Sequence, residues 1–332
     1  MDPEVEEYLR THPSEPLPTD ITAFRSISAA VETAAVDRLG APSPSLTESY
    51  LPIPMRDGHL NTAKVFQPST STDGSPLVVL FHGGGFAVGS PEQFTLLGRA
   101  LVELLNCTVV SAAYRLAPER PFPAAAEDAW DTTQHLATNP PDGSDLAAGF
   151  LVGGASSGAN LAAVVAQLAV DRRLDPPLTG QFLSLPLIFS SAQLVPEKFR
   201  AEYTSLTTNT TDPIQSLPSL HAILARYNPT LTSPFFSPIN SPNVHPPKTY
   251  IQVCGLDPLR DDGVVYGDVL RERGVETRVE VYEGFPHGWW VFMPGLRSSK
   301  RAVGDMVRGV GWLLGRGVEG ERVVGKVGEG VE

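Results

Sequence analysis

Short apolar runs alternate along this chain with longer segments in which apolar residues recur at helical spacing. The short runs predict buried strands at residues 77–81, 108–113, 147–152, 181–187, 249–254 and 278–282. The longer segments predict helices at residues 124–137, 161–170 and 264–273 and a last helix that ends near residue 314. Alternation of this kind predicts an α/β fold with a mostly parallel central sheet flanked by helices.

Residues 51–66 form an exception near the start of this pattern. Two strand-like stretches are separated there by Arg56-Asp57-Gly58. Because an Asp-Gly step readily adopts the positive φ of a tight turn, we expect a β-hairpin.

Two segments carry apolar residues but no strand pattern. Residues 1–45 are polar and rich in proline, with Phe24, Ile27 and Val31 at helical spacing after a possible helix cap at Thr19-Asp20. Residues 190–235 are rich in Ser, Thr and Pro, and their scattered apolar residues are typical of a lid. We therefore expect an α/β core at 46–189 and 236–315, a helical cap from 1–45 and 190–235, and a flexible tail at 316–332.

Composition limits the function classes. With 332 residues and 42% hydrophobic residues, the chain can bury one large core. A net charge of −12 argues against nucleic acid as a partner, and no apolar run is long enough for a membrane span. The N-terminus lacks a signal-peptide pattern, and Cys107 and Cys254 lie in apolar runs, so we expect buried free thiols and a cytoplasmic location.

Gly154-x-Ser156-x-Gly158 lies between a predicted strand and a predicted helix. In that context the pattern predicts a nucleophile elbow, in which a strained turn exposes the serine hydroxyl and the glycines make room for neighbouring backbone. The alternative is an ordinary Gly/Ser turn, because this short pattern also occurs by chance. Two further features favour the elbow.

The first feature is His82-Gly83-Gly84-Gly85, which directly follows the strand at 77–81. Backbone N–H groups of Gly83, Gly84 and Gly85 can converge there with the N–H of Ser157 to hold an oxyanion. The alternative is a flexible loop at the end of a strand. We expect His82 itself to have a structural, hydrogen-bonding role.

The second feature is a base and an acid in the order that an elbow requires. His287 follows the strand at 278–282, and Asp257 follows the strand at 249–254, so both lie where parallel sheets hold catalytic groups. Asp261 and Asp262 are expected in the first turn of the next helix for structural reasons, at about 0.3–1 kcal/mol each. Asp212 is assigned to the lid.

These motifs together resemble the hormone-sensitive-lipase-like esterases. The resemblance also rests on the stretches 114–119, 121–128 and 257–261 and runs from about residue 50 to 315. It implies an α/β-hydrolase fold with a cap and ester hydrolysis without a cofactor or metal. The chain departs from the usual pattern at Ala155 and Ser157, where the family has Asp and Ala, so its choice of substrate can differ. Glu119, Glu127 and Asp128 are expected to brace Arg115 and helix ends.

The combined features predict a serine carboxylic-ester hydrolase that forms an acyl-enzyme on Ser156 and acts on a small to medium apolar ester. The expected partner is thus a small-molecule ester, and a homodimer stays open. Alternatives are a lactone, thioester or amide hydrolase in a secondary-metabolite pathway. A non-catalytic ligand receptor on the same fold is a remote alternative, since the chain retains Ser156, Asp257 and His287.

Overall fold

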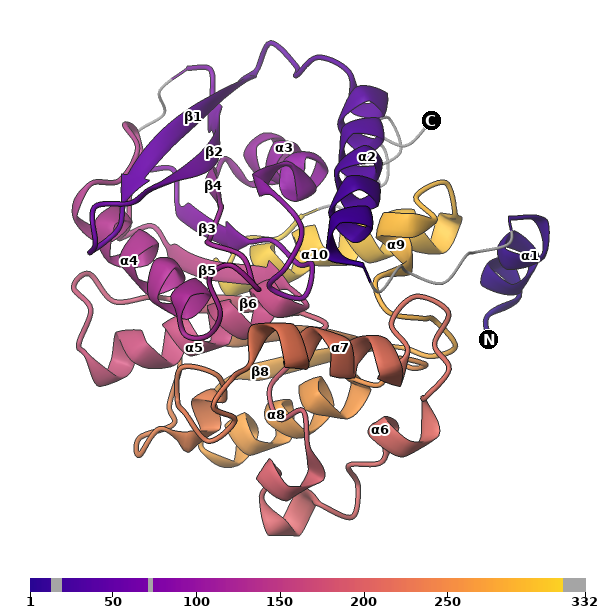
Figure 1. Ribbon diagram of the computed structural model, residues 1–332. Coiled ribbons are helices and arrows are strands. Elements are labelled where there is room, and N and C mark those ends of the chain that lie inside the picture. Colours follow the sequence, from indigo (N-terminus) through magenta and orange to yellow (C-terminus); the bar gives the residue numbers. More distant parts are fainter. Residues whose placement is uncertain (13–19, 71–73, 319–332) are drawn as a thin grey trace.

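The computed structural model describes residues 1–12, 20–70 and 74–318, so Thr19 and most of the expected tail lie outside the described part of the chain. Its centre is an eight-stranded sheet with the strand order β1-β2-β4-β3-β5-β6-β7-β8 (Figure 1). The strands are β1 (Leu46–Pro54), β2 (Leu60–Pro68), β3 (Leu77–Phe81), β4 (Thr108–Ala112), β5 (Phe150–Ala155), β6 (Gly180–Ser184), β7 (Thr249–Cys254) and β8 (Thr277–Tyr282). β1 and β2 form the predicted antiparallel hairpin, and β3 to β8 pair in parallel.

β5 and β6, the two strands next to Ser156, each end three residues away from the predicted position. β5 begins and ends three residues later than expected, because Gly153 and Gly154 still pair with the end of β3. β6 ends at Ser184, before the apolar run does, because Leu185 adopts a positive φ of 56° and turns the chain out of the sheet. As a result, the carboxyl ends of β5 and β6 both lie beside Ser156.

Helices cover both faces of the sheet (Figure 1). They are α1 (Pro3–Thr11), α2 (Ile21–Leu39), α3 (Thr95–Leu105), α4 (Ala124–Thr138), α5 (Ser157–Asp171), α6 (Ser205–Thr208), α7 (Leu217–Tyr227), α8 (Arg260–Glu272), α9 (Trp289–Phe292) and α10 (Arg297–Leu313). α4, α5 and α8 pack on one face, and α3 and α10 pack on the other. The prediction overlooked α3, although Leu97, Leu101 and Leu105 recur there at a spacing of four residues.

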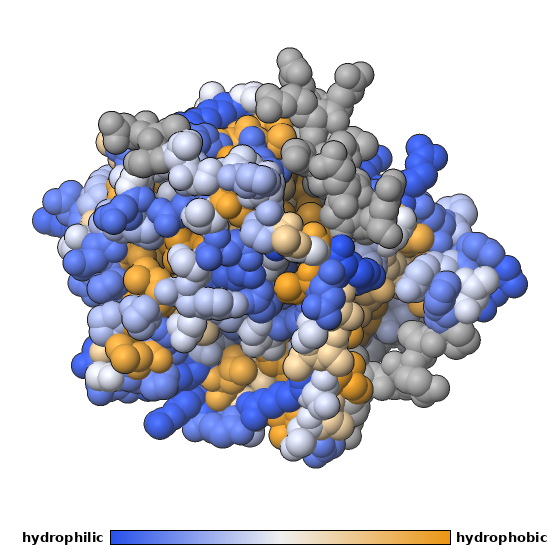
Figure 2. All heavy atoms as spheres, turned by 90° about the horizontal axis from the view of Figure 1, so that it is seen from above, coloured by the Kyte–Doolittle hydropathy of each residue, from blue (hydrophilic) through white to orange (hydrophobic). Residues whose placement is uncertain are grey.

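Polar and apolar residues are mixed on the outer surface. On the face seen from above, apolar residues form small patches between polar ones (Figure 2). Within the described residues, no helix combines the length and apolar character needed to cross a membrane.

The N-terminal helices are tied to the body at separate places. α1 buries Val5, and the Glu4 carboxylate accepts hydrogen bonds from the first residues of α10. α2 begins after Asp20, whose side chain accepts a bond from the Ala23 N–H, as the predicted cap requires. α2 then lies beside the glycine loop, since Glu32 accepts two bonds from Ser90.

The predicted brace around Arg115 is only partly right. Asp128 is fully buried and holds the Arg115 guanidinium with both oxygens. Glu119 instead pairs with Arg25 of α2, and Glu127 pairs with Arg56. The carboxylates that the sequence grouped together therefore stabilise three different parts of the molecule.

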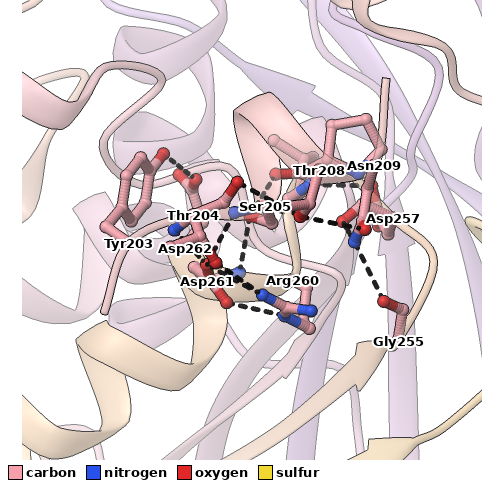
Figure 3. Close-up of polar contacts among 12 residues, drawn as sticks. Tyr203, Thr204, Ser205, Thr208, Asn209, Gly255, Asp257, Arg260, Asp261 and Asp262 are labelled. Atoms are coloured by element: carbon pink, nitrogen blue, oxygen red, sulfur yellow. Dashed lines mark hydrogen bonds and ion pairs between the residues drawn. The ribbon is translucent and has the colours of Figure 1, made fainter. Parts of the chain in front are cut away.

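Buried carboxylates at the start of α8 anchor the 190–235 insertion (Figure 3). Asp262 accepts N–H bonds from Ile188 and Phe189, each at 2.6 Å, and the hydroxyl of Tyr203 at 2.5 Å. Asp261 accepts the N–H groups of residues 204 and 205. Burial raises the pKa of Asp262 to about 6, although these hydrogen bonds lower it.

Asp261 and Asp262 thus lie in the first turn of α8 as predicted, but both are buried, so we now expect a larger cost of replacing them. The mild cost expected from the sequence assumed exposed carboxylates near a helix end. A buried acceptor with several donors costs more to remove, because each donor is left unsatisfied.

We expect Asp262→Ala to lower the free energy of unfolding by about 3 kcal/mol, since it leaves two buried N–H groups and the Tyr203 hydroxyl without an acceptor. Urea denaturation measures this. The matched control is Asp268→Ala on the same helix, where a partly exposed carboxylate pairs only with Arg271 and about 0–0.5 kcal/mol should be lost. Equal losses in the two variants would contradict the anchoring role.

Candidate active site

Ser156 occupies the sharp turn between β5 and α5. Its backbone has φ 54° and ψ −117°, a conformation that is rare for a residue with a side chain. The flanking glycines are needed for close packing: a Cβ on Gly158 would lie 1.9 Å from the Phe81 carbonyl oxygen, and one on Gly154 would lie 2.4 Å from the backbone of Gly158. The predicted strand, turn and helix are confirmed.

His287 and Asp257 lie next to this serine. The Nε2 atom of His287 is 3.2 Å from Ser156 Oγ, and its Nδ1 atom is 2.5 Å from Asp257 Oδ2. Asp257 follows β7, and His287 follows β8, so neighbouring parallel strands deliver both side chains to one edge of the sheet. The other Asp257 oxygen accepts the Leu259 N–H at 2.9 Å, which fixes the carboxylate.

The glycine loop supplies fewer free amides than its sequence suggests. The Gly83 N–H donates to Gln93 Oε1 at 2.7 Å, so it is already occupied. Gly84 and Gly85 adopt positive φ values of 115° and 60°, and their N–H groups have no acceptor among the described residues. Ser157 is the first residue of α5, where an N–H has no partner within the helix.

His82 has the structural role predicted for it. Its ring is buried and stacks on Tyr114 with 4.2 Å between ring centroids, and Nδ1 lies 2.8 Å from the Gly83 carbonyl oxygen. Burial lowers the pKa of His82 to about 4, so the ring is neutral at physiological pH. The Tyr114 hydroxyl donates to the His82 carbonyl at 2.8 Å and holds the start of the loop.

Two residues of the insertion contact the loops that carry His287 and Asp257. Asp212 accepts the His287 N–H at 2.7 Å, and its other oxygen accepts the N–H groups of residues 214 and 215. Asn209 donates to the carbonyls of Gly255 and Asp257 at 2.9 and 3.0 Å (Figure 3). The sequence analysis assigned Asp212 to the lid and did not consider Asn209, because no local motif marks either one.

The charges around His287 favour its protonated form. Burial, the largest effect, lowers the pKa of His287, but the Asp257 charge, the hydrogen bond to Asp257 and the Asp212 charge together raise that pKa above its ordinary value of 6.5. Burial, with the nearby Asp257 charge, raises the pKa of Asp212 to about 6. Near neutral pH, two carboxylates therefore act on one imidazole.

A cavity of about 190 Å³ opens over Ser156 and His287. Its walls are one face of α2, the glycine loop and apolar residues of the insertion such as Ile214 and Ile223. A larger hollow of about 630 Å³ near Lys248 contains neither Ser156 nor His287 and has no role in this site. In the described part of the chain, no group of three or more His, Cys, Asp or Glu side chains could hold a metal ion.

Comparison with known proteins points to one family. Residues 78–291 match the model of a protein family whose description is "alpha/beta hydrolase fold". The chain is 33% identical over 320 residues to a protein of the AB hydrolase superfamily from Schizosaccharomyces pombe, which covers 95% of this chain and 94% of that protein. It is 32% identical over 248 residues to the carboxylesterase NlhH of Mycobacterium tuberculosis, which covers 73% and 75% of the two chains.

Solved structures agree with these matches. The crystal structure of vibralactone cyclase is similar with a TM-score of 0.84 and 28% sequence identity, over 94% of each chain. The similarity therefore extends well beyond the residues around Ser156.

We expect kcat/KM to rise with pH and to reach its plateau through a midpoint above 6.5, because only neutral His287 can accept a proton and its pKa is raised. Rates with a chromogenic ester between pH 5 and 9 measure this. A midpoint below 6.5, with chemistry limiting the rate, would contradict the raised pKa.

We expect Asp212→Asn to lower that midpoint and to reduce kcat by about 10-fold or more, because it removes a charge near His287 and leaves one oxygen to accept the N–H groups that two oxygens now accept. KM should change little. The control is Asp171→Asn, which also removes a hydrogen-bonded carboxylate but one that contacts Gln167 and Ser241. If both variants kept the wild-type midpoint and kcat, Asp212 would have no positioning role.

Proposed function

Since this chain belongs to the hormone-sensitive-lipase-like family of α/β hydrolases, we propose that Ser156, Asp257 and His287 are its catalytic triad and that its substrate is a small to medium apolar ester. The chain is a serine hydrolase of the carboxylesterase type. One observation carries the assignment of residues: His287 bridges Ser156 Oγ and Asp257 Oδ2 at 3.2 and 2.5 Å.

In the first half of the reaction, neutral His287 accepts the Ser156 proton at Nε2 while Oγ attacks the ester carbonyl carbon. The carbonyl oxygen becomes an oxyanion, and the free N–H groups of Gly84, Gly85 and Ser157 stabilise it. We assign Gly83 to the frame of this oxyanion hole, because its own N–H is bonded to Gln93. His287 then donates the proton to the leaving alcohol, and the acyl group stays on Ser156.

In the second half, His287 accepts a proton from water, and the resulting hydroxide attacks the acyl carbon. The tetrahedral intermediate collapses, His287 returns the proton to Ser156 Oγ, and the carboxylic acid leaves. Asp257 keeps a proton on Nδ1 of His287 throughout, so that Nε2 faces Ser156.

The side chains that line the cavity are mostly apolar, which favours an apolar substrate, and they come from segments that we assign to a cap. Phe24, Ile27 and Val31 of α2 line the cavity together with Ile214 and Ile223 of the insertion. We propose that α2 and residues 190–235 form the cap over the α/β core. α1 supports this cap only indirectly, because it binds the start of α10.

Lactone hydrolysis is the second candidate reaction. Vibralactone cyclase is similar over 94% of each chain, and an acyl-enzyme on Ser156 serves an ester and a lactone by the same steps. The free, buried thiols of Cys107 and Cys254 support the proposed cytoplasmic location. The homodimer stays a prediction.

We expect a fluorophosphonate probe to label Ser156, because an activated serine attacks phosphorus as it attacks a carbonyl carbon. Ser156→Ala should lose labelling and turnover, and Asp257→Asn should lose up to about 10⁴-fold in kcat. Intact mass spectrometry and steady-state kinetics measure both. The control is Ser299→Ala, which removes another buried serine hydroxyl and should still be labelled. Labelling that persists in Ser156→Ala would refute the nucleophile.

A further inference from the structure

Gln93 lies beside the nucleophile in the wall of the cavity over Ser156. It belongs to the short 3₁₀ helix η1 (Pro91–Phe94), which connects the glycine loop to α3. Its side chain is partly buried and lines the same cavity as Ser156 and His287. A Cβ placed on Gly83 would lie 3.4 Å from Gln93 Oε1 and 3.5 Å from Ser156 Cβ, so the amide is about two atomic contacts from the nucleophile.

One hydrogen bond fixes the orientation of the Gln93 amide. The Gly83 N–H donates to its Oε1 at 2.7 Å. Because a backbone N–H can only donate, the amide atom that faces it must be the oxygen, and Nε2 is directed away from Gly83. Nε2 has no acceptor among the described residues, and it is not one of the unpaired side-chain atoms that are sealed from solvent. Gln93 therefore offers an accessible, unused donor at the cavity wall.

The backbone around Gln93 is held in place by its own hydrogen bonds. The Ser111 hydroxyl of β4 donates to the Pro91 carbonyl at 2.8 Å. The Ser90 hydroxyl accepts the Glu92 N–H at 3.2 Å. A donor that is positioned in advance loses little conformational freedom when it binds a ligand, so Nε2 is suited to recognition.

Two carboxylates in the same wall affect which partner can approach this donor. Glu32 and Glu92 both line the cavity over Ser156. Glu92 pairs with Lys64 at 2.6 Å, whereas Glu32 accepts two bonds from Ser90 and has no cationic partner in the described part of the chain. A negative charge therefore remains near the donor, and it disfavours an anionic group there. A neutral oxygen atom is the acceptor that fits.

We propose that Gln93 determines substrate specificity by donating a hydrogen bond from Nε2 to a second, neutral oxygen atom of the substrate. This proposal rests on the proposed function. The second oxygen differs from the reacting carbonyl oxygen, which is assigned to the N–H groups of Gly84, Gly85 and Ser157. The substrate class is therefore an uncharged ester that carries an additional ether, keto or hydroxyl oxygen a few bonds from the ester carbonyl.

Discrimination follows from the loss of water at Nε2. A bound substrate displaces water from the cavity wall, and an alkyl chain then leaves the amide N–H groups without an acceptor. A site that hydrogen-bonds its substrate rejects an analogue that lacks the partner atom, because the polar group of the site is left unpaired. An ester with an oxygen at the right place is thus preferred over an alkyl ester of the same shape.

The experiment compares esters in which one ether oxygen replaces one methylene group. Two pairs vary the acyl side: ethyl methoxyacetate with ethyl butyrate, and ethyl 3-methoxypropanoate with ethyl pentanoate. A third pair varies the alcohol side: 2-methoxyethyl acetate with butyl acetate. Acid release in a pH-stat gives kcat/KM for each ester, and the quantity compared is the ratio of the ether ester to its alkyl partner. The electronic effect of the ether oxygen is the same for every variant, so a change in this ratio reports recognition.

We expect Gln93→Met to lower this ratio about two- to tenfold in at least one pair, because methionine has similar length but no donor. The pair that responds identifies the side of the ester that Gln93 binds. Gln93→Met also removes the acceptor of the Gly83 N–H, but the resulting loss of rate is common to both esters and cancels in the ratio. Gln93→Glu keeps an oxygen for Gly83 and lacks the donor, so it should lower the same ratio.

The matched control is Gln134→Met, which makes the same replacement at an exposed position of α4 outside the cavity and should keep every wild-type ratio. Wild-type ratios in all three pairs for both Gln93 variants, with hydrolysis and labelling of Ser156 retained, would overturn this inference alone. Absence of both hydrolysis and labelling in the wild type would instead overturn the proposed function.

Discussion

The close packing of Gly158 against the carbonyl of Phe81 is the constraint on which the site depends. It brings the first turn of α5 against the end of β3, where the glycine loop begins. The N–H group of Ser157 therefore lies close to those of Gly84 and Gly85. The same turn gives Ser156 its positive φ. Strain in the serine turn is tolerated because β5 and α5, both largely buried, hold its two ends.

The electrostatics around His287 also depend on close packing. Asp257 bonds the ring, and Asp212 bonds the backbone N–H of the same residue. Both carboxylates are buried, so their charges are poorly screened and act strongly on the imidazole. The ring nitrogen that faces Ser156 is made more basic as a result, and burial only partly offsets this.

The positions of residues that lie in a local pattern could be predicted from the sequence. Ser156 lies in a glycine motif, His287 and Asp257 follow apolar runs, and parallel strands bring such positions to one edge. Contacts made across the fold could not be predicted. Asp212 bonds a residue 75 positions away, and the occupied N–H of Gly83 depends on the side chain of Gln93. Asp262 looked like an exposed helix-end carboxylate because the sequence, which does indicate an insertion at 190–235, does not show that Tyr203 of this insertion packs against Asp262.

The bonds from Asn209 and Asp212 also affect how this molecule can change during evolution or redesign. Part of the 190–235 segment lines the cavity over Ser156, and Asn209 and Asp212 of the same segment bond the loops of Asp257 and His287. A chimera that receives this segment from a relative would exchange both properties at once. The residues that affect substrate range therefore cannot be exchanged separately from those that hold the Asp257 and His287 loops. A graft must bring equivalents of Asn209 and Asp212 to preserve the rate of catalysis.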